Sequence, residues 1–548
     1  MTSASRRLFA MLVFVFACGG IARAANAPVL FVPLDDRPVT RQLPAMLGAI
    51  SGVRVLEPQR HLLGNYLRAG DPAAIGRWLD RESAERDFGS AVISTDMLAY
   101  GGLVASRIPG PDYTTAFQRL SAIRRLHDRD PHAWVAAFAT VVRLAPTGVP
   151  PIGDARHFFA AYPIWKYIQQ YANLPDPLPE RDAAYAARLR ALAGPALDEY
   201  LAVRARNLAV DRALLLATAA GTIDRLVIGQ DDAGVVGLHV PEIAQLETME
   251  RQYLSPKQSS IEPGADELGM VLVAHAMARD ARWHPRIAVR YSTPSGALVQ
   301  DPLEFEPIGA TIASLVRLVG GREVRRRPDI VLAVRVPHPT ALTDRLFLAS
   351  MRGALARKRR VALVDLTFLD GNDAAELSFM QRLLRDGLAA RLDAYASWNT
   401  DANSVGTALA EAVAAGAGRR LGTFDRRAQV AFTFDRILDD VYFHAVVRPD
   451  LERTLALEGI VDHTYLLPRV AARTQRLASA ALWQYAPGLL AALAPREHIA
   501  ALRITLPWDR TFECEIEPAL APDLPRSAMR SVRSPRRSAT RSARSPRR

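Results

Sequence analysis

Cysteine is nearly absent from this 548-residue chain, which contains only Cys18 and Cys514. Cys18 lies in an N-terminal segment that we expect to be removed, so the mature chain would hold one cysteine and no intramolecular disulfide. No second long apolar run follows that segment, and the remaining sequence therefore predicts no membrane-spanning helix. Stability must come from a hydrophobic core, for which the roughly 500 residues between the two ends are ample.

The sequence also lacks the short motifs of several common catalytic sites. It contains no G-x-S-x-G, H-E-x-x-H, Walker or G-x-G-x-x-G pattern. The eleven histidines are scattered without the spacing of metal ligands. Serine hydrolases, zinc proteases and dinucleotide enzymes of the standard types are not indicated, and no cofactor is evident.

Net charge is small once the two ends are set aside. The formal charge of the whole chain is +12, but residues 526–548 hold nine arginines, the N-terminal segment holds three, and neither contains a carboxylate. Removing these twelve charges leaves about zero, so global charge does not indicate a nucleic-acid-binding protein. The C-terminal tail is Arg/Ser-rich with little to bury, and we expect it to be disordered. It could still touch anionic surfaces.

Residues 1–24 have the pattern of a signal peptide. A basic start precedes the apolar run Leu8–Cys18, and Ala22-Arg23-Ala24 supplies a cleavage site. We therefore expect an exported protein, periplasmic or secreted. An alternative is a lipoprotein signal at Val15–Cys18, which would anchor the chain through a lipid on Cys18.

Between the ends, short apolar strands alternate with amphipathic helices, as in the predicted strands Val29–Leu34 and Ile330–Val336. This alternation predicts an α/β fold with a mainly parallel sheet and helices outside it. Eight or nine strands suit a (β/α)8-like barrel, which we favour, and they also suit two doubly wound lobes. The expected units are a catalytic-type α/β domain over 25–415, a mostly helical region over 416–524 packed on it, and a disordered tail over 525–548.

Carboxylates follow several predicted strands at the point where each strand ends. They are Asp35, Asp36, Asp96, Asp231 and Asp232, with Asp365 as a further candidate. Because the carboxyl ends of parallel strands meet at one edge of a sheet, we expect these side chains to converge. Converging carboxylates are costly unless they are paired with cations or protonated, and such clusters often have a function. We expect Arg37, Arg107 and Arg143 to supply the compensating charge.

Two kinds of chemistry require such a cluster. Glycoside cleavage needs one carboxyl group as acid and another as nucleophile or base. Hard divalent cations also bind several carboxylate oxygens, so a metal remains an open alternative. The candidate catalytic residues are Asp231 and Asp232, followed by Asp36 and Asp96.

Other polar and aromatic residues are candidates for binding substrate. We expect Arg37 and Arg107 to orient the substrate with Asp35 beside them, and Tyr100 and Trp398 to shape the subsite. Asn399 and Asn403 could hydrogen-bond hydroxyl groups. A structural alternative is that Thr400 or Asn403 caps a helix.

Six motifs spread along the mature chain carry a resemblance. They are Pro33-Leu-Asp-Asp-Arg-Pro38, Ser94-Thr-Asp-Met-Leu-Ala-Tyr-Gly-Gly-Leu-Val-Ala-Ser-Arg107, Gly229-Gln-Asp-Asp-Ala233, Gly264-Ala-Asp-Glu267, Trp398-Asn-Thr-x-x-Asn403 and Pro507-Trp-Asp-Arg510. Together they resemble an uncharacterised bacterial family known only as a domain of unknown function. The resemblance implies one unit rather than fused modules, and its fourth motif adds Asp266 and Glu267 to the candidate substrate-binding residues. Asp370-Gly-Asn-Asp373 departs from the family pattern, so Asp373 is not carried over.

These observations lead to one main hypothesis and two alternatives. The main hypothesis is an exported hydrolase that acts on a carbohydrate or glycoconjugate through its clustered carboxylates. The first alternative is a non-catalytic glycan- or solute-binding protein built from two lobes. The second is a metal-dependent hydrolase, which sensitivity to a chelator would distinguish from the first hypothesis.

Overall fold

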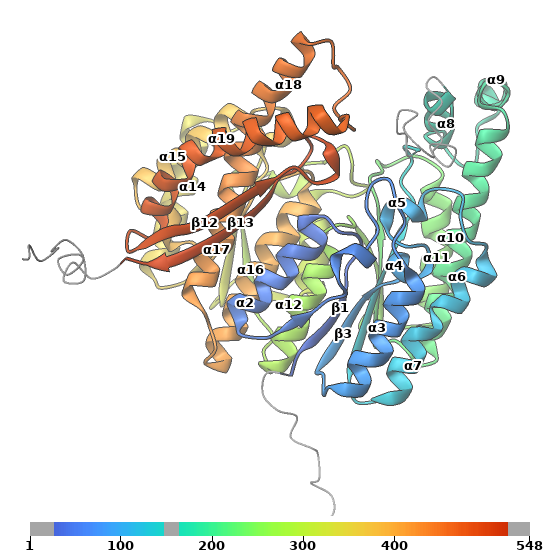
Figure 1. Cartoon of the computed structure of the whole chain (residues 1–548), viewed down its shortest axis with the longest axis horizontal. Coiled ribbons are helices and arrows are strands. Elements are labelled where there is room, and N and C mark those ends of the chain that lie inside the picture. Colours follow the sequence, from blue (N-terminus) through green and yellow to red (C-terminus); the bar gives the residue numbers. More distant parts are fainter. Residues whose placement is uncertain (1–26, 147–163, 524–548) are drawn as a thin grey trace, which may run out of the picture.

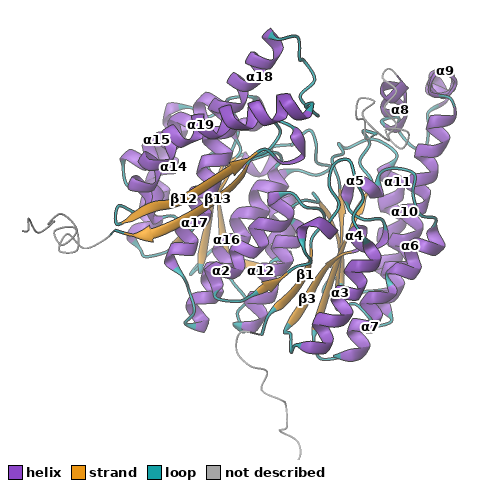
Figure 2. Ribbon diagram, in the orientation of Figure 1, coloured by secondary structure: helices purple, strands orange, loops and turns teal. Residues whose placement is uncertain are grey.

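The computed structural model describes residues 27–146 and 164–523. The expected signal peptide, the lipid-anchor alternative at Cys18 and the arginine-rich tail lie outside these residues. Within them, parallel strands form two sheets of six and five strands, and helices cover both faces of each sheet (Figure 1, Figure 2). No helix in this part of the chain is both long and apolar enough to cross a membrane.

The first sheet has the strand order β2-β1-β3-β4-β5-β6, and all neighbours are parallel. Its strands are β1 (Val29–Val32), β2 (Val55–Leu56), β3 (Ser90–Ser94), β4 (Trp134–Val141), β5 (Arg225–Gln230) and β6 (Ser259–Pro263). Because β1 lies between β2 and β3, the chain first extends the sheet in one direction and then reverses. This is the winding of doubly wound α/β folds, in which ligands bind beside the point of reversal.

The second sheet repeats this winding. Its order is β11-β10-β9-β7-β8, so the strand that comes first in the chain again lies between the second and the third. Its strands are β7 (Arg286–Tyr291), β8 (Arg322–Glu323), β9 (Ile330–Arg335), β10 (Arg360–Asp365) and β11 (Ala394–Ala396).

The expectation of an α/β fold with parallel strands and alternating helices is confirmed. The (β/α)8-like barrel is not shown by these pairings, because they divide the described strands between two sheets. The division matches the alternative of two doubly wound lobes. Sequence alone left this choice open because both folds use the same alternation of strand and helix.

A layer of helices lies between the two sheets. Both sheets contribute to one shared hydrophobic core. It contains Val29 and Phe31 of β1 and Ile330 and Leu332 of β9, which are alternate residues of their strands. The helices of this central layer are α2 (Leu43–Ser51), α12 (Leu268–Asp280), α13 (Ile308–Leu318) and α16 (Asp401–Leu421). Figure 1 shows α2, α12 and α16 running side by side. The two lobes therefore share a core and form one folded unit.

Two further cores cover the outer faces. On the first sheet Leu30 and Val32 pack against an outer helical layer, and on the second sheet Val331 and Ala333 do the same. The outer helices of the first lobe include α3 (Pro72–Glu85), α4 (Thr95–Ala99), α7 (Ser121–Arg129), α10 (Pro195–Ala219) and α11 (His239–Tyr253). Those of the second include α14 (Ala341–Ala356), α15 (Asp373–Arg385) and α19 (Pro468–Leu493). The remaining helices of the first lobe are α5 (Leu103–Ser106), α6 (Tyr113–Arg119), α8 (Ile164–Ala172) and α9 (Ala183–Ala193).

The C-terminal part of the chain returns to both lobes. The boundary expected after residue 415 falls inside α16, which continues to Leu421. After it come α17 (Arg426–Arg436), the π-helix η8 (Ile437–Val447), α18 (Arg448–Leu457) and α19. The antiparallel hairpin β12 (Glu497–Thr505) and β13 (Glu515–Pro522), which we did not expect, closes this region (Figure 2).

The close approach of α16 to Trp283 predicts that Gly416→Ala destabilises the protein. A Cβ atom at Gly416 would lie 2.3 Å from the ring of Trp283. Overpacking of this kind costs about 1–3 kcal/mol, and urea denaturation would measure the loss.

The matched control is Gly488→Ala in α19. A Cβ atom there would meet nothing within 4 Å, so the helix should gain up to about 1 kcal/mol. Equal stabilities of the two variants would contradict the tight packing of α16.

Candidate functional site

Five of the predicted carboxylates lie at the carboxyl edge of the first sheet. Asp365 does not join them, because it ends β10 of the second sheet, where it pairs with Arg335 at 2.8 Å. Asp35 and Asp36 follow β1, Asp96 follows β3, and Asp231 and Asp232 follow β5. The helix after β1 joins the central layer and the helices after β3 lie on the outer face, so the loops after these strands diverge. We call this region the acidic edge. It is the position at which doubly wound sheets bind ligands.

Arg37 joins two carboxylates from opposite sides of this edge. Its Nε donates to Asp35 Oδ2 at 2.9 Å, and its two terminal nitrogens donate to Asp266 at 2.9 and 2.5 Å. Asp266 comes within reach because α12, which begins two residues later, packs back over β1. Thr40 Oγ1 also donates to Asp35 Oδ1, at 2.6 Å. The predicted residues Asp35, Arg37 and Asp266 thus form one buried ion network.

Asp36 is held by the C-terminal part of the chain. Trp508 Nε1 donates to its Oδ1 at 2.6 Å, and Arg60 Nε donates to its Oδ2 at 3.3 Å. Burial raises the pKa of Asp36, while the Trp508 and Arg60 hydrogen bonds oppose that rise. The Trp508 ring stacks on Tyr66 with 5.4 Å between ring centroids. These contacts give Asp36 a role in holding the structure together.

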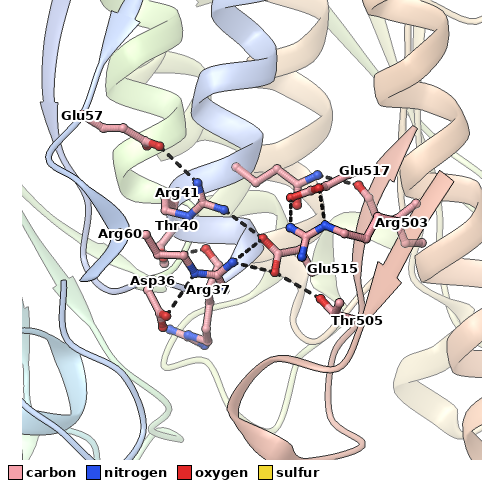
Figure 3. A network of polar contacts seen from close by, with 12 residues as sticks. Asp36, Arg37, Thr40, Arg41, Glu57, Arg60, Arg503, Thr505, Glu515 and Glu517 are labelled. Atoms are coloured by element: carbon pink, nitrogen blue, oxygen red, sulfur yellow. Dashed lines mark hydrogen bonds and ion pairs between the residues drawn. The ribbon is translucent and has the colours of Figure 1, made fainter. Parts of the chain in front are cut away.

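Figure 3 shows a second connection beside Asp36. Glu515, the first residue of β13, accepts hydrogen bonds from Arg41 at 2.8 Å and from Arg60 at 2.9 and 3.0 Å. Arg41 also donates to Glu57, at 3.1 Å. The C-terminal hairpin is therefore fixed to the loops that follow β1 and β2.

Asp96 and Asp231 form the centre of the acidic edge. Burial and the negative charge of Asp231 raise the pKa of Asp96 to about 7, although Thr140 Oγ1 donates to its Oδ2 at 3.0 Å. Burial also raises the pKa of Asp231, but the charge of Arg107 acts in the opposite direction. Arg107 Nε lies 2.8 Å from Asp231 Oδ2. Both neighbouring carboxyl groups therefore have a raised pKa but different partners, the Thr140 hydroxyl for Asp96 and the Arg107 guanidinium for Asp231.

Asp232 is more accessible than Asp231, with 37% of its side chain exposed. Its φ angle of 22° lies in the left-handed region, which non-glycine residues seldom adopt. Strained backbone often marks residues whose orientation matters for function. Arg143 Nη1 lies 3.5 Å from Asp232 Oδ2. As predicted, Arg37, Arg107 and Arg143 all pair with carboxylates of this edge.

Tyr100 is buried in the outer core of the first lobe, where the Arg206 guanidinium lies 4.4 Å from its ring centroid. Burial, with Asp211 and Asp96 nearby, raises its pKa strongly. Its ring is covered by Arg206. The expected part of Tyr100 in shaping a subsite stays a prediction.

Glu267 and three residues that sequence analysis missed form a neighbouring group. Asp301, Glu304 and Asp401 each offer a carboxylate oxygen, and these atoms lie within 4.8 Å of one another. We call Asp301, Glu304 and Asp401 the carboxylate triad. Ala233 N donates to Leu303 O at 3.0 Å, so the triad's loop contacts the loop that carries Asp232. Asp301 and Glu304 do not directly follow a predicted strand, which is why the pattern used for the other carboxylates did not find them.

Trp398 and Asn399 line a separate cavity of about 370 Å³ in the second lobe. Thr400 caps α16 by accepting from Asn403 N at 3.3 Å, as in the structural alternative. Asn403 is buried in the first turn of α16 and is not among the residues lining the cavity.

The other polar residues lining this cavity come mainly from α15, η8 and α18. They are Asp373, Glu376, Ser397, Arg436, Asp439, Asp440, His444, Arg448, Glu452 and Glu513. Asp439 and Asp440 stand next to each other in the sequence, as Asp35 and Asp36 do, and that doublet could have drawn attention to them. Arg436 neutralises the pair at 3.0 and 2.8 Å. None of the four candidate catalytic residues lines this cavity.

The Arg37 network predicts a large loss of stability in Arg37→Met, which keeps volume and removes charge. Asp35 and Asp266 would be left buried without their cation, which typically costs about 3–5 kcal/mol. Adding Asp266→Asn should recover part of the loss, and denaturant unfolding would measure both changes.

Arg251→Met is the control, because Arg251 pairs with Glu247 on the exposed face of α11. Exposed pairs contribute at most about 1 kcal/mol. A cost for Arg37→Met no larger than that of the control would show that the network contributes little.

Comparison with known proteins identifies the family of this chain. No curated protein and no solved structure matches the chain. Residues 29–517, which include both lobes and most of the C-terminal hairpin, match a family model described as a protein of unknown function (DUF4127). The resemblance inferred from the six motifs is therefore confirmed, and the chain belongs to the DUF4127 family.

Proposed function

We propose that this chain is an exported hydrolase that cleaves a carbohydrate or glycoconjugate with the carboxyl groups of the acidic edge. Export rests on the signal-peptide pattern of residues 1–24. The chemistry rests on one observation: the carboxyl groups of Asp96 and Asp231 are neighbours, and Asp231, unlike Asp96, is paired with an arginine. Acid–base catalysis by two carboxyl groups requires such a difference.

In this proposal Asp96 is the general acid. Its pKa of about 7 means that a large fraction of the carboxyl group is protonated at neutral pH. Asp231 is held as a carboxylate by Arg107, 2.8 Å away. A protonated acid beside an ionised carboxylate is the arrangement that protonates a leaving oxygen while a second group attacks or activates water.

Asp232 is the proposed nucleophile or base. It is the partly exposed member of the group, with 37% of its side chain exposed, and its backbone is strained at a φ angle of 22°. Arg143, on the loop after β4, lies on the same side and is positioned to orient a polar substrate. Asp36 is not assigned to the reaction, because Trp508 and Arg60 already hold it.

The proposed substrate class draws on the cavity of the second lobe. An indole ring and an amide, from Trp398 and Asn399, stand on its wall with several carboxylates. Its volume of about 370 Å³ lies in the range of about 300–1,000 Å³ typical of small-molecule sites. Hydroxyl-rich ligands are commonly bound by such combinations of a ring face and polar groups. The cavity adjoins the helix that follows Arg37, since Pro38 and Val39 also line it.

The two-lobe architecture favours one alternative, a glycan- or solute-binding protein without turnover. Doubly wound lobes bind ligands beside their points of reversal, whether or not a bond is cleaved. Turnover separates the two functions. A binding protein would be stabilised by its glycan and would release no product.

The test is release of reducing ends from a panel of glycans by the full mature chain. Asp96→Asn and Asp232→Asn should each reduce the rate by about 100-fold or more, because loss of a general acid or base costs about 10²–10⁴-fold. Asp224→Asn is the control, since Asp224 lies at the opposite, amino end of β5 and binds only backbone there. It should retain full activity.

If the folded wild-type protein releases nothing from a broad panel, the glycosidase proposal fails. Glycan-dependent stabilisation in the same experiment would then support the binding alternative. Equal losses in all three variants would assign the effect to general destabilisation instead of chemistry.

The acid role of Asp96 also predicts the pH dependence of activity. Asp96 donates its proton only while protonated, so kcat/KM should fall as pH rises through about 7, the pKa of the group. The expected slope above that pH is about tenfold per pH unit. A flat profile between pH 6 and 9 in the active wild type would exclude Asp96 as the acid.

A further inference from the structure

The carboxylate triad stands out because its charges have no positive partner. Asp301, Glu304 and Asp401 have relative exposures of 1%, 2% and 0%. Across residues 27–146 and 164–523, no lysine or arginine forms an ion pair with any of the three. The nearby carboxylates Asp35, Asp266 and Asp231 each pair with an arginine. The triad thus differs from these three paired carboxylates.

Several triad oxygens also lack hydrogen bonds. Both carboxylate oxygens of Asp401 and Oε2 of Glu304 are buried without a partner. Asp301 is different, because its Oδ1 accepts from Leu303 N and its Oδ2 from Asp401 N, both at 2.9 Å. These backbone bonds fix the orientation of Asp301. Free oxygens on the other two side chains remain available for a ligand.

A fourth carboxylate, from a different element, is directed at the same place. Glu267 lies in the loop after β6, is fully buried, and has two oxygens without hydrogen-bond partners. Its carboxyl group lies between Gly264 and the first turn of α16: a Cβ atom on Gly264 would be 2.1 Å from Glu267 Oε1 and 2.9 Å from Ala402 Cβ. Its charge acts on Glu304, and that of Asp401 acts on Glu267. Glu267 therefore stands beside the triad, close enough for their charges to act on one another, while the three triad residues form the group within 4.8 Å.

The amino end of α16 cannot balance these charges by itself. A helix terminus supplies only about half a positive charge, whereas four carboxylates surround it here. Burying unpaired carboxylates costs far more than burying neutral groups of the same size. A bound cation would supply the missing charge and satisfy the free oxygens together.

We propose that Asp301, Glu304, Asp401 and Glu267 form a binding site for a calcium ion. The ligands are all carboxylate oxygens, which hard cations prefer. Metal–oxygen bonds of about 2.3–2.6 Å let calcium hold oxygens up to about 5 Å apart. The triad oxygens lie within 4.8 Å of one another. Three or four protein carboxylates also suit calcium better than magnesium, which usually keeps several waters.

The ion would join three parts of the molecule. Glu267 belongs to the first lobe, Asp401 begins the central helix α16, and Asp301 and Glu304 lie in the loop before α13. Since Leu303 O accepts from Ala233 N at 3.0 Å, the ion would also support the loop that carries Asp232. The site is independent of the proposed hydrolase activity, and its test needs no substrate.

The experiment is calorimetric titration of the metal-free full-length protein with CaCl2, together with thermal unfolding in calcium and in EDTA. We expect binding of one ion and a higher Tm in calcium, because a ligand that binds only the folded state stabilises it. Glu304→Gln and Asp401→Asn should each weaken calcium binding at least tenfold. In EDTA both variants should be at least as stable as the wild type, because each removes one of the crowded charges.

Glu411→Gln is the matched control, since Glu411 is a fully buried carboxylate in the same helix, outside the triad. It should bind calcium as the wild type does. Absence of calcium binding by the folded wild type, unchanged binding in both triad variants, or tighter binding of MgCl2 than of CaCl2 would overturn the proposal. Calcium binding without glycan hydrolysis would support this site while contradicting the proposed function.

Discussion

The cost of burying charge is the constraint on which the rest of this structure depends. Arg37 is buried between Asp35 and Asp266, which belong to loops at β1 and β6, and its bonds hold the carboxyl edge of the first sheet together. Arg107 and Arg143 serve the same purpose for Asp231 and Asp232. Removing a partner from a buried ion pair leaves an uncompensated charge. The arginines therefore specify where each loop must lie.

The same constraint explains why the chain behaves as one unit. Glu515 in the C-terminal hairpin binds Arg41 and Arg60 of the first lobe (Figure 3). Trp508 also donates a hydrogen bond to Asp36. The central layer of α2, α12, α13 and α16 gives both sheets a common core. A family model that spans residues 29–517 fits this arrangement, because neither lobe is complete without the other or without the hairpin.

The two sheets repeat one winding but differ in what they place at their carboxyl ends. The first sheet presents the acidic edge, and the second presents a cavity lined by Trp398, Asn399 and the π-helix η8. π-Helices are rare and are often found at functional sites. The proposed division of labour follows from this difference: carboxyl chemistry at the first edge, ligand contacts in the second lobe, and a cation between them. The proposed calcium site would connect these parts, because Glu267 comes from the first lobe, Asp301 and Glu304 follow β7 of the second sheet, and Asp401 begins α16.

Sequence by itself determined the local elements and the positions of most carboxylates. Continuous apolar runs identified β1, β3, β4, β5, β9 and β10, because buried parallel strands are apolar on both faces. The placement of Asp96 and Asp231 beside each other followed from the rule that parallel strands end at one edge. Short or partly exposed strands such as β6 and the β12–β13 hairpin lack that signal, since their sequences are mixed and their stability comes from neighbours.

Tertiary structure alone decided how the strands divide and which charges meet. The barrel and the two-lobe fold share one pattern of strand and helix, and only the pairing between distant strands distinguishes them. Arg37 and Asp266 lie 229 positions apart, and Asp301 and Asp401 lie 100 apart. No local pattern records such partners, because the energy of a buried ion pair depends on distance and desolvation in the folded chain. The sequence shows which residues carry charge, and the fold decides which charges are balanced.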